Sequence, residues 1–200
     1  MNKECKVKTG IVRMSYLNVL EPRCQEGQEP RYSVSLVIPK TDTKTLNAIK
    51  AAIQAAYEDG MDKLRTGKTV PPLASLKTPL RDGDAERPDD PVYAGSWFIN
   101  ASCPDTRAPQ VVDKFGRILT TEDTVYSGMY GRATVVMYAF NKNGNKGIAC
   151  GLNNLLKTAD GERLGGCASA LDDFADDIDT DTNTADSYTG EVLSEGDTPF

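Results

Sequence analysis

The sequence predicts a mainly β protein, a small and strongly curved antiparallel barrel of five strands with one helix inserted between strands 2 and 3. Three observations predict this fold. Several segments alternate apolar and polar residues with a period of two, one segment alone has helical periodicity, and turn-forming residues separate the segments. A parallel α/β sheet would need a helix after nearly every strand, so the order of elements excludes it.

The first two strands are expected at residues 6–20 and 31–38. Gly10 marks a bulge in the first strand, where the inward face changes. In the second strand the even-numbered residues from Tyr32 to Ile38 are apolar and face the core, whereas Arg31 begins an outward face that carries Ser33. Pro39 ends this strand.

One amphipathic helix follows, and Asp42 or Thr43 is the expected N-cap. Its apolar residues recur at spacings of three and four, namely Leu46, Ile49, Ile53 and Tyr57. The helix is expected to end at Gly60 or to run on to Leu64. Residues 67–91 are rich in proline, glycine and charge, and their centre, 81–90, is predicted to be an exposed loop.

Strands resume at residues 92–102, followed by a hairpin at 109–119 in which Gly116 supplies the positive φ of the turn. Residues 131–140 form the next strand, 141–146 a turn, and 147–157 the last strand. In the strand 92–102 the alternation assigns Trp97 to the core and Phe98 to the polar outer face beside Asn100.

Aromatic and basic side chains share the outer faces of these strands. Aromatic rings stack on bases of any sequence, and neighbouring cations neutralise phosphates, so this pattern predicts binding of single-stranded nucleic acid. The alternative is that individual rings pack beneath the helix or the long loop. The predicted nucleic-acid-binding residues are Arg13, Tyr16, Phe98, Asn100, Lys114, Phe115, Arg117, Arg132, Tyr138, Phe140, Lys142 and Lys146.

Charge divides the chain into two unlike parts. The last 37 residues hold ten carboxylates and no lysine or arginine, so residues 1–163 carry +4 and the remainder −10. This asymmetry favours a nucleic-acid-binding body with an anionic competitor attached to it. The alternative is a disordered acidic tail that serves only solubility, but the final aromatic residue, Phe200, has no use in that role.

The composition argues against an enzyme and against a bound cofactor or metal. The chain has no histidine, no pair of cysteines at C-x-x-C spacing and no glycine-rich phosphate loop. Two alternatives remain open. The carboxylates within 82–90 could serve a metal-dependent nuclease, and the chain could instead be a non-enzymatic interaction protein that acts through its acidic tail. A calcium loop at 177–183 is disfavoured because Thr182 stands where such a loop needs glycine.

The five cysteines are scattered, and no secretion signal or 18-residue apolar run is present. We therefore expect reduced thiols, a cytoplasmic location and no membrane-spanning segment. The sequence leaves open whether the chain forms a homodimer.

Three segments resemble a family of bacteriophage single-stranded-DNA-binding proteins: Gly95-Ser-Trp-Phe-Ile-Asn-Ala-Ser102, Val125-Tyr-Ser-Gly-Met-Tyr-Gly-Arg132 and Lys146-Gly-Ile-Ala-Cys-Gly-Leu-Asn-Asn-Leu155. The order of elements resembles the family from residue 5 to about residue 165. The resemblance implies an oligonucleotide/oligosaccharide-binding (OB) fold at 1–165, a disordered acidic tail at 166–200, and single-stranded DNA as the partner in phage replication or recombination.

The ending Glu195-Gly-Asp-Thr-Pro-Phe200 resembles the tips with which bacterial and phage single-stranded-DNA-binding proteins dock replication partners. That resemblance implies partner-binding roles for Asp197, Pro199 and Phe200. The tip departs from the pattern at Thr198, where an apolar residue usually stands.

Overall fold

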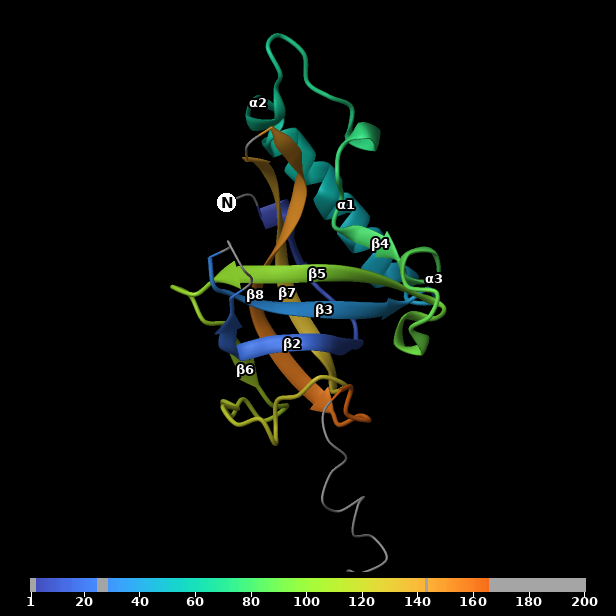
Figure 1. The fold of residues 1–200 in the computed structure, drawn as a ribbon, viewed down its shortest axis with the longest axis vertical. Helices are drawn as coiled ribbons and strands as arrows, with labels where there is room; N and C mark the ends of the chain where they lie inside the picture. Colours follow the sequence, from blue (N-terminus) through green and yellow to red (C-terminus); the bar gives the residue numbers. More distant parts are fainter. Residues whose placement is uncertain (1–2, 25–28, 143, 166–200) are drawn as a thin grey trace, which may run out of the picture. The chain divides into compact units, whose positions relative to one another are not determined.

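Five long strands close into a barrel in the computed structural model, which describes residues 3–24, 29–142 and 144–165. They are β2 (Val12–Arg23), β3 (Arg31–Pro39), β5 (Ser96–Pro104), β7 (Tyr130–Lys142) and β8 (Asn145–Ala159). Around the barrel the order is β2, β3, β5, β8, β7, and β7 pairs with β2 to close it (Figure 1). All neighbours are antiparallel except β5 and β8, which meet in parallel where Ser102 faces Gly151. The predicted mainly β OB barrel is confirmed, with one parallel seam.

Short strands extend this barrel: β1 (Lys6–Lys8) pairs with β7, β4 (Leu80–Asp82) with β5, and β6 (Gln110–Val112) with β8. The first predicted strand therefore divides at Gly10, with β1 and β2 on either side of the break. A Cβ at Gly10 would collide with the side chains of Asp42 and Thr45, and the Gly10 N–H donates to Thr45 Oγ1 over 2.8 Å. The break is thus locked against the start of the inserted helix.

The inserted helix α1 (Thr43–Asp59) lies between the second and third barrel strands along the chain, as predicted. Asp42 caps it by accepting a hydrogen bond from the Thr45 N–H at 3.0 Å, which satisfies an amide that has no partner within the helix. Leu46 and Ile49 are buried against the barrel. After Gly60 the short helix α2 (Met61–Leu64) follows, and α1 and α2 together are here called the helical arm.

Residues 81–90 are mostly exposed, as predicted, but the prediction that they form an irregular loop is wrong. This stretch contains β4 and a one-turn helix, α3 (Gly83–Glu86), between two 3-10 turns, η2 (Leu73–Ser75) and η3 (Pro91–Tyr93). Aspartates order it: Asp82 accepts from the Asp84 N–H at 3.0 Å, and Asp90 from the Val92 N–H at 3.1 Å. Because η3 occupies 91–93, β5 begins at Ser96 and not at the expected residue 92.

The alternating strands bury the residues that their patterns predict. Val34, Leu36 and Ile38 lie in the barrel core, as do the alternate residues of β7 from Ala133 to Ala139. The turn after β6 is also confirmed, because Gly116 has a φ of 79° and its N–H donates to the Asp113 carbonyl. No helix in the described part of the chain is long and apolar enough to cross a membrane.

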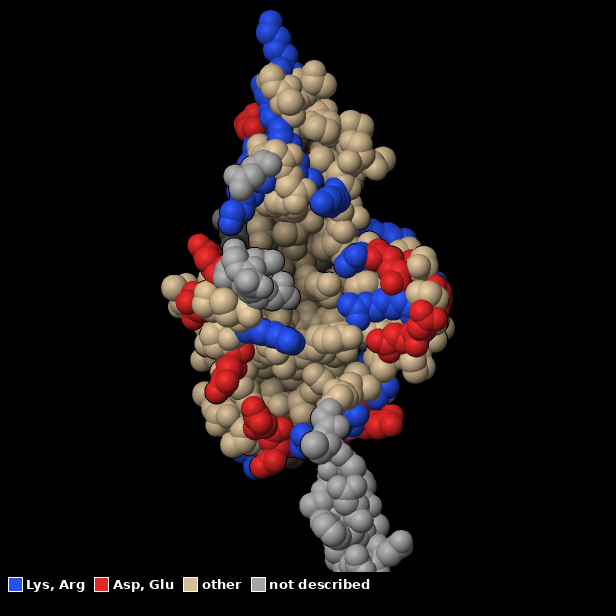
Figure 2. Space-filling model, viewed as in Figure 1, with Lys and Arg blue, Asp and Glu red and all other residues tan. Residues whose placement is uncertain are grey.

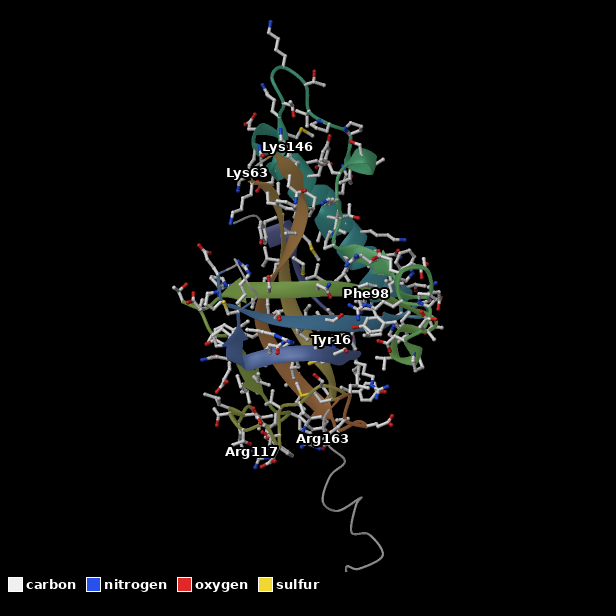
Figure 3. The ribbon with its side chains drawn as sticks, in the orientation of Figure 1. Tyr16, Lys63, Phe98, Arg117, Lys146 and Arg163 are labelled. Atoms are coloured by element: carbon white, nitrogen blue, oxygen red, sulfur yellow. The ribbon has the colours of Figure 1, made fainter. Side chains whose placement is uncertain are left out.

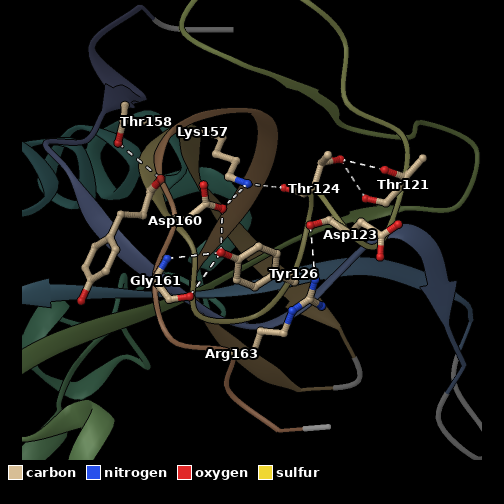
Figure 4. A network of polar contacts seen from close by, with 10 residues as sticks. Thr121, Asp123, Thr124, Tyr126, Lys157, Thr158, Asp160, Gly161 and Arg163 are labelled. Atoms are coloured by element: carbon tan, nitrogen blue, oxygen red, sulfur yellow. Dashed lines mark hydrogen bonds and ion pairs between the residues drawn. The ribbon is translucent and has the colours of Figure 1, made fainter. Parts of the chain in front are cut away.

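A polar network holds the end of the described chain against the loop before β7 (Figure 4). The Tyr126 hydroxyl donates to Asp160 Oδ1 at 2.7 Å, Lys157 Nζ lies 2.6 Å from the same carboxylate, and the Arg163 guanidinium lies 4.3 Å from the centre of the Tyr126 ring. The hydrogen bond from Lys157 keeps the pKa of Asp160 below its ordinary value. Residues up to Gly165 form one compact unit, and residues 166–200 lie outside the described residues.

Candidate nucleic-acid interface

The outer face of β2, β3 and β5 is hollowed into a groove of about 290 Å³, here called the sheet groove. Figure 2 shows the hollow with lysine and arginine side chains around an uncharged floor. Among the described residues, three arginines line it, Arg23, Arg31 and Arg87, against one carboxylate, that of Glu29. The excess of positive charge suits an anionic polymer.

The floor of the sheet groove is a polar ladder across three strands. Ser33 of β3 stands opposite Asn18 of β2 and Ser102 of β5. Asn18 Nδ2 donates to Ser33 Oγ over 3.4 Å, and Arg31 Nε donates to Ser102 Oγ over 3.2 Å. Two residues further along β3, Ser35 pairs with Asn100 of β5, which lies on the same face. The side chain of Asn100 is exposed, as predicted. Small polar side chains leave room for bases to lie on the sheet and offer them hydrogen bonds.

Tyr16 stands at one side of this floor with 54% of its surface exposed. Its φ of 47° makes it the one non-glycine residue with positive φ in the described part of the chain, and it lies at the irregularity in β2–β3 pairing between Ser15 and Asn18. Such a conformation is unfavourable for a side chain other than glycine and concentrates at functional sites. The bulge therefore holds an aromatic ring out over the groove.

Arg87 lies over the same side of the groove. Its guanidinium carbon is 5.0 Å from the Tyr16 ring centre, 4.5 Å from that of Tyr93 and 5.2 Å from that of Phe98. Among the described residues it has no carboxylate partner. Since stacking uses the face of a guanidinium and hydrogen bonding its edge, Arg87 is positioned to donate to a phosphate.

The expectation that Phe98 presents an open ring is wrong. Phe98 lies on the outer face of β5 but is only 1% exposed, in a small second cluster with Val37 and Tyr93. Tyr93 meets it edge to face with ring centres 5.0 Å apart, and its hydroxyl donates to Ser35 Oγ. The segment 80–93, which includes the predicted loop 81–90, supplies this cover. Trp97 lies on the core side as predicted, but it is only half-buried, with Lys40 and Lys50 over its ring.

The structure does not bring the remaining predicted residues to the sheet groove. Phe115 is 70% exposed on the turn after β6, between Lys114 and Arg117, and Arg117 is paired with Asp113 at 2.7 Å. Figure 3 shows Arg117 far from Tyr16.

Five further predicted residues lie elsewhere on β2 and β7. Arg13 donates to the Glu162 carbonyl at 3.2 Å and so holds the end of the described chain. Arg132 and Phe140 are half-buried on β7, outside the cavities that line the hollowed face. Tyr138, also on β7, is 41% exposed and borders the cavities beyond the sheet groove, and Lys142 is exposed at the tip of the β7–β8 hairpin.

Lys146, at the start of β8, has a structural role: it contacts the end of α2. Its ammonium donates to the carbonyls of Leu64 and Arg65 at 3.2 and 2.9 Å and to the Thr66 hydroxyl at 2.6 Å. These contacts tie the β7–β8 hairpin to the end of α2 and use all three donors of the ammonium group.

We expect Lys146→Met to lower the free energy of unfolding by about 1–2 kcal/mol, because it removes three charged hydrogen bonds, one of them to the part-buried Leu64 carbonyl. Urea denaturation followed by circular dichroism measures this change. Lys142→Met, on the same hairpin, is the control and should leave stability unchanged. Full stability of Lys146→Met together with weaker DNA binding would instead assign Lys146 to the DNA.

Sequence reasoning missed Arg31 and Arg87. A signal for Arg31 was present, since it shares the outward face of its strand with Ser33. Arg87 had none, because it lies in a segment without periodicity and reaches the groove only through the fold of residues 80–93.

Two of the carboxylates considered for a metal-dependent nuclease, Asp82 and Asp84, have structural partners. Lys40 Nζ lies 2.8 Å from Asp82 and 2.7 Å from Asp84, and Asp84 also accepts the Gly95 N–H at 2.7 Å. The hydrogen bonds from Lys40 and Gly95 lower the pKa of Asp84, and the two carboxylates raise the pKa of Lys40. Among the described residues no cluster of three or more metal-ligating side chains occurs.

An OB barrel whose open face joins a polar ladder to an exposed ring and to arginines without an ion-pair partner among the described residues defines the class of oligonucleotide-binding OB-fold proteins. The comparisons with known proteins agree. The chain belongs to the family described as "Enterobacter phage Enc34, ssDNA-binding protein", which matches residues 5–185. The phage family inferred from the three sequence segments is thereby confirmed.

Relatives and solved structures extend the match. "Putative protein p50" of Acyrthosiphon pisum secondary endosymbiont phage 1 is 31% identical over 176 residues, covering 86% of this chain and 93% of that protein. The single-stranded DNA-binding protein of bacteriophage Enc34 in complex with ssDNA is 28% identical, with a TM-score of 0.66 over 82% of this chain and 91% of that one. Bacteriophage T7 gp2.5, a single-stranded DNA-binding protein at 17% identity, shares the fold, with a TM-score of 0.55 over 90% of this chain and 98% of its own.

The predicted partner-binding residues Asp197, Pro199 and Phe200 lie outside the described residues.

Proposed function

We propose that this protein binds single-stranded DNA without sequence preference in phage replication or recombination. The observation that carries the proposal is the Tyr16–Arg87 pair over the polar floor of the sheet groove, with the two groups 5.0 Å apart. Tyr16 stacks on a base, Arg87 and Arg31 meet phosphates, and Asn100 hydrogen-bonds base edges. Kinship with the Enc34 protein, which has been solved with ssDNA, supports the same ligand here.

Fluorescence anisotropy with labelled oligo-dT, oligo-dA and a duplex of the same length tests this function. Similar affinities for the two single strands, both well above that for the duplex, are expected, because stacking needs unpaired bases but tolerates any of them. The affinity should fall as salt rises, since phosphate contacts release counterions. Equal affinity for duplex and single strands would contradict the proposal.

The acidic C-terminal residues are proposed to regulate this binding. Their ten carboxylates compete with DNA for the cations of the body, because attachment to the same chain gives them a high effective concentration. When DNA displaces them, Asp197, Pro199 and Phe200 become available to a replication or recombination protein.

Deleting residues 170–200 is therefore expected to tighten binding to oligo-dT, most strongly at low salt, where screening is weakest. The matched control keeps the length of the segment and replaces its carboxylates with amides. If both variants bind as the full chain does, the carboxylates do not compete with DNA.

A further inference from the structure

The hollowed face does not end at the sheet groove. Arg31 and Ser102 also line a second cavity of about 390 Å³, between the α1–α2 junction and the strands β7 and β8. This helix-side groove is walled by apolar residues such as Ala56, Val136 and Met137. Because the two cavities share residues, one bound polymer can pass from the first to the second without leaving the surface.

We propose that the helix-side groove is a second subsite for single-stranded DNA, which takes the nucleotides that follow those in the sheet groove. The proposal rests on the function proposed above and adds the path of the strand. It gives the inserted helical arm, α1 and α2, a direct part in binding.

The charges of the helix-side groove favour a polyanion. Of the residues that the structure describes, Arg31, Lys63 and Arg107 line it, against the carboxylate of Asp59 alone. Neither Arg31 nor Lys63 forms an ion pair with any described residue. Arg107 is held at the rim because its Nη2 donates to the Leu152 carbonyl at 2.8 Å.

Lys63 is presented by a braced segment (Figure 3). Asn141 Nδ2 donates to the Lys63 carbonyl at 3.0 Å, and Lys146 binds the carbonyl of the next residue, Leu64. The arm is therefore fixed to the β7–β8 hairpin at the position where its lysine borders the groove. A braced cation binds a phosphate with a smaller loss of conformational freedom than one on a mobile loop.

Tyr138 provides the ring for a base in this subsite. It lines the helix-side groove with 41% of its surface exposed. A Cβ at Gly151 would stand 3.5 Å from its Cε1 atom, so the ring rests against the side-chain-free backbone of β8. Since Gly151 is the partner of Ser102 across the parallel seam, the ring lies beside the point at which the two grooves meet.

A DNA strand could also leave the meeting point of the two grooves by a second path. A cavity of about 600 Å³ on the β4 side is lined by Lys77, Arg81 and Glu86, and also reaches Tyr138. There the guanidinium of Arg81 is already paired with the carboxylate of Glu86. Among the described residues, fewer cations without an ion-pair partner line the β4 side, so the geometry favours the helix-side path.

The test compares Lys63→Gln with Lys77→Gln, which remove one positive charge from the helix side and from the β4 side. Each variant of the full chain is titrated with dT oligomers of about 6 and about 20 nucleotides, because a single OB fold covers roughly 4–16. Lys63→Gln should weaken binding of the long oligomer alone and lower its salt slope by about 0.7, the value for one phosphate of a single strand. Lys77→Gln should match the unchanged chain.

Tyr138→Ala should weaken binding of the long oligomer about tenfold, and Tyr138→Phe should retain it, because the ring stacks and the hydroxyl does not. Melting temperatures verify that the variants fold. Losses that are equal for both oligomers, or a loss in Lys77→Gln but not in Lys63→Gln, would overturn the helix-side path. Failure of the unchanged chain to bind either oligomer would instead contradict the proposed function.

Discussion

Phe98→Ala is expected to lower the free energy of unfolding by about 3–5 kcal/mol, the range measured when a buried phenylalanine is truncated. The ring is 1% exposed, and its loss leaves a cavity between Val37 and Tyr93. Arg81 and Arg87 also lie over the ring, at 5.3 and 5.2 Å, so the substitution loosens the segment that covers β5. Urea denaturation followed by circular dichroism measures the effect.

Phe115→Ala is the matched control for Phe98. Its ring is 70% exposed, so stability should change by no more than about 0.5 kcal/mol. Phe98→Ala is also expected to weaken DNA binding indirectly, because Arg87 loses one of its stacking partners. Unchanged stability of Phe98→Ala with a large loss of DNA affinity would show that DNA, and not residues 80–93, is the partner of this ring.

Tyr16→Ala is expected to weaken binding to oligo-dT by about 1–3 kcal/mol, the contribution of one base stacked on an aromatic ring. Stability should be unchanged, because the Tyr16 side chain is more than half exposed and lies outside both apolar clusters. Fluorescence anisotropy gives the affinity, and thermal melting gives the stability.

Two further variants separate stacking from backbone effects at this position. Tyr16→Phe keeps the ring and should bind as the unchanged chain does. Tyr16→Gly removes the ring but suits the φ of 47°, so it should lose affinity as Tyr16→Ala does and at least match its stability. If Phe115→Ala weakens binding and Tyr16→Ala does not, the DNA path runs over the β6 turn and the sheet groove is not the interface.

The inward faces of the strands were predictable from their alternation. On β3 the even-numbered residues from Val34 to Ile38 enter the core as their alternation predicts, and on β7 the run from Ala133 to Ala139 does the same. The helix and its Asp42 cap were equally predictable, because the cap acts within three residues. The alternation of its strand placed Asn100 on the outer face, whereas Tyr16 has the parity of the buried Val12 and Met14 and is exposed because β2 is irregular between Ser15 and Asn18.

Prediction failed where contacts join distant parts of the chain. The alternation assigns Phe98 to the outer face of its strand, which is correct, but a period of two does not report whether another segment packs on that face. Lys146 shows the same limit: its sequence neighbours indicate an exposed turn, whereas its ammonium binds carbonyls about 80 residues away.

The sequence by itself determined the barrel, the inserted helix, the outward faces of the strands and the separation of charge between body and tail. These features depend on local periodicity, capping and composition, which any stretch of chain displays on its own. Only the tertiary structure decided which rings stay open and which cations meet them. Residues 80–93 fold over β5, bury Phe98 and place Arg87 beside Tyr16, and such long-range packing leaves no periodic trace in the residues that form it.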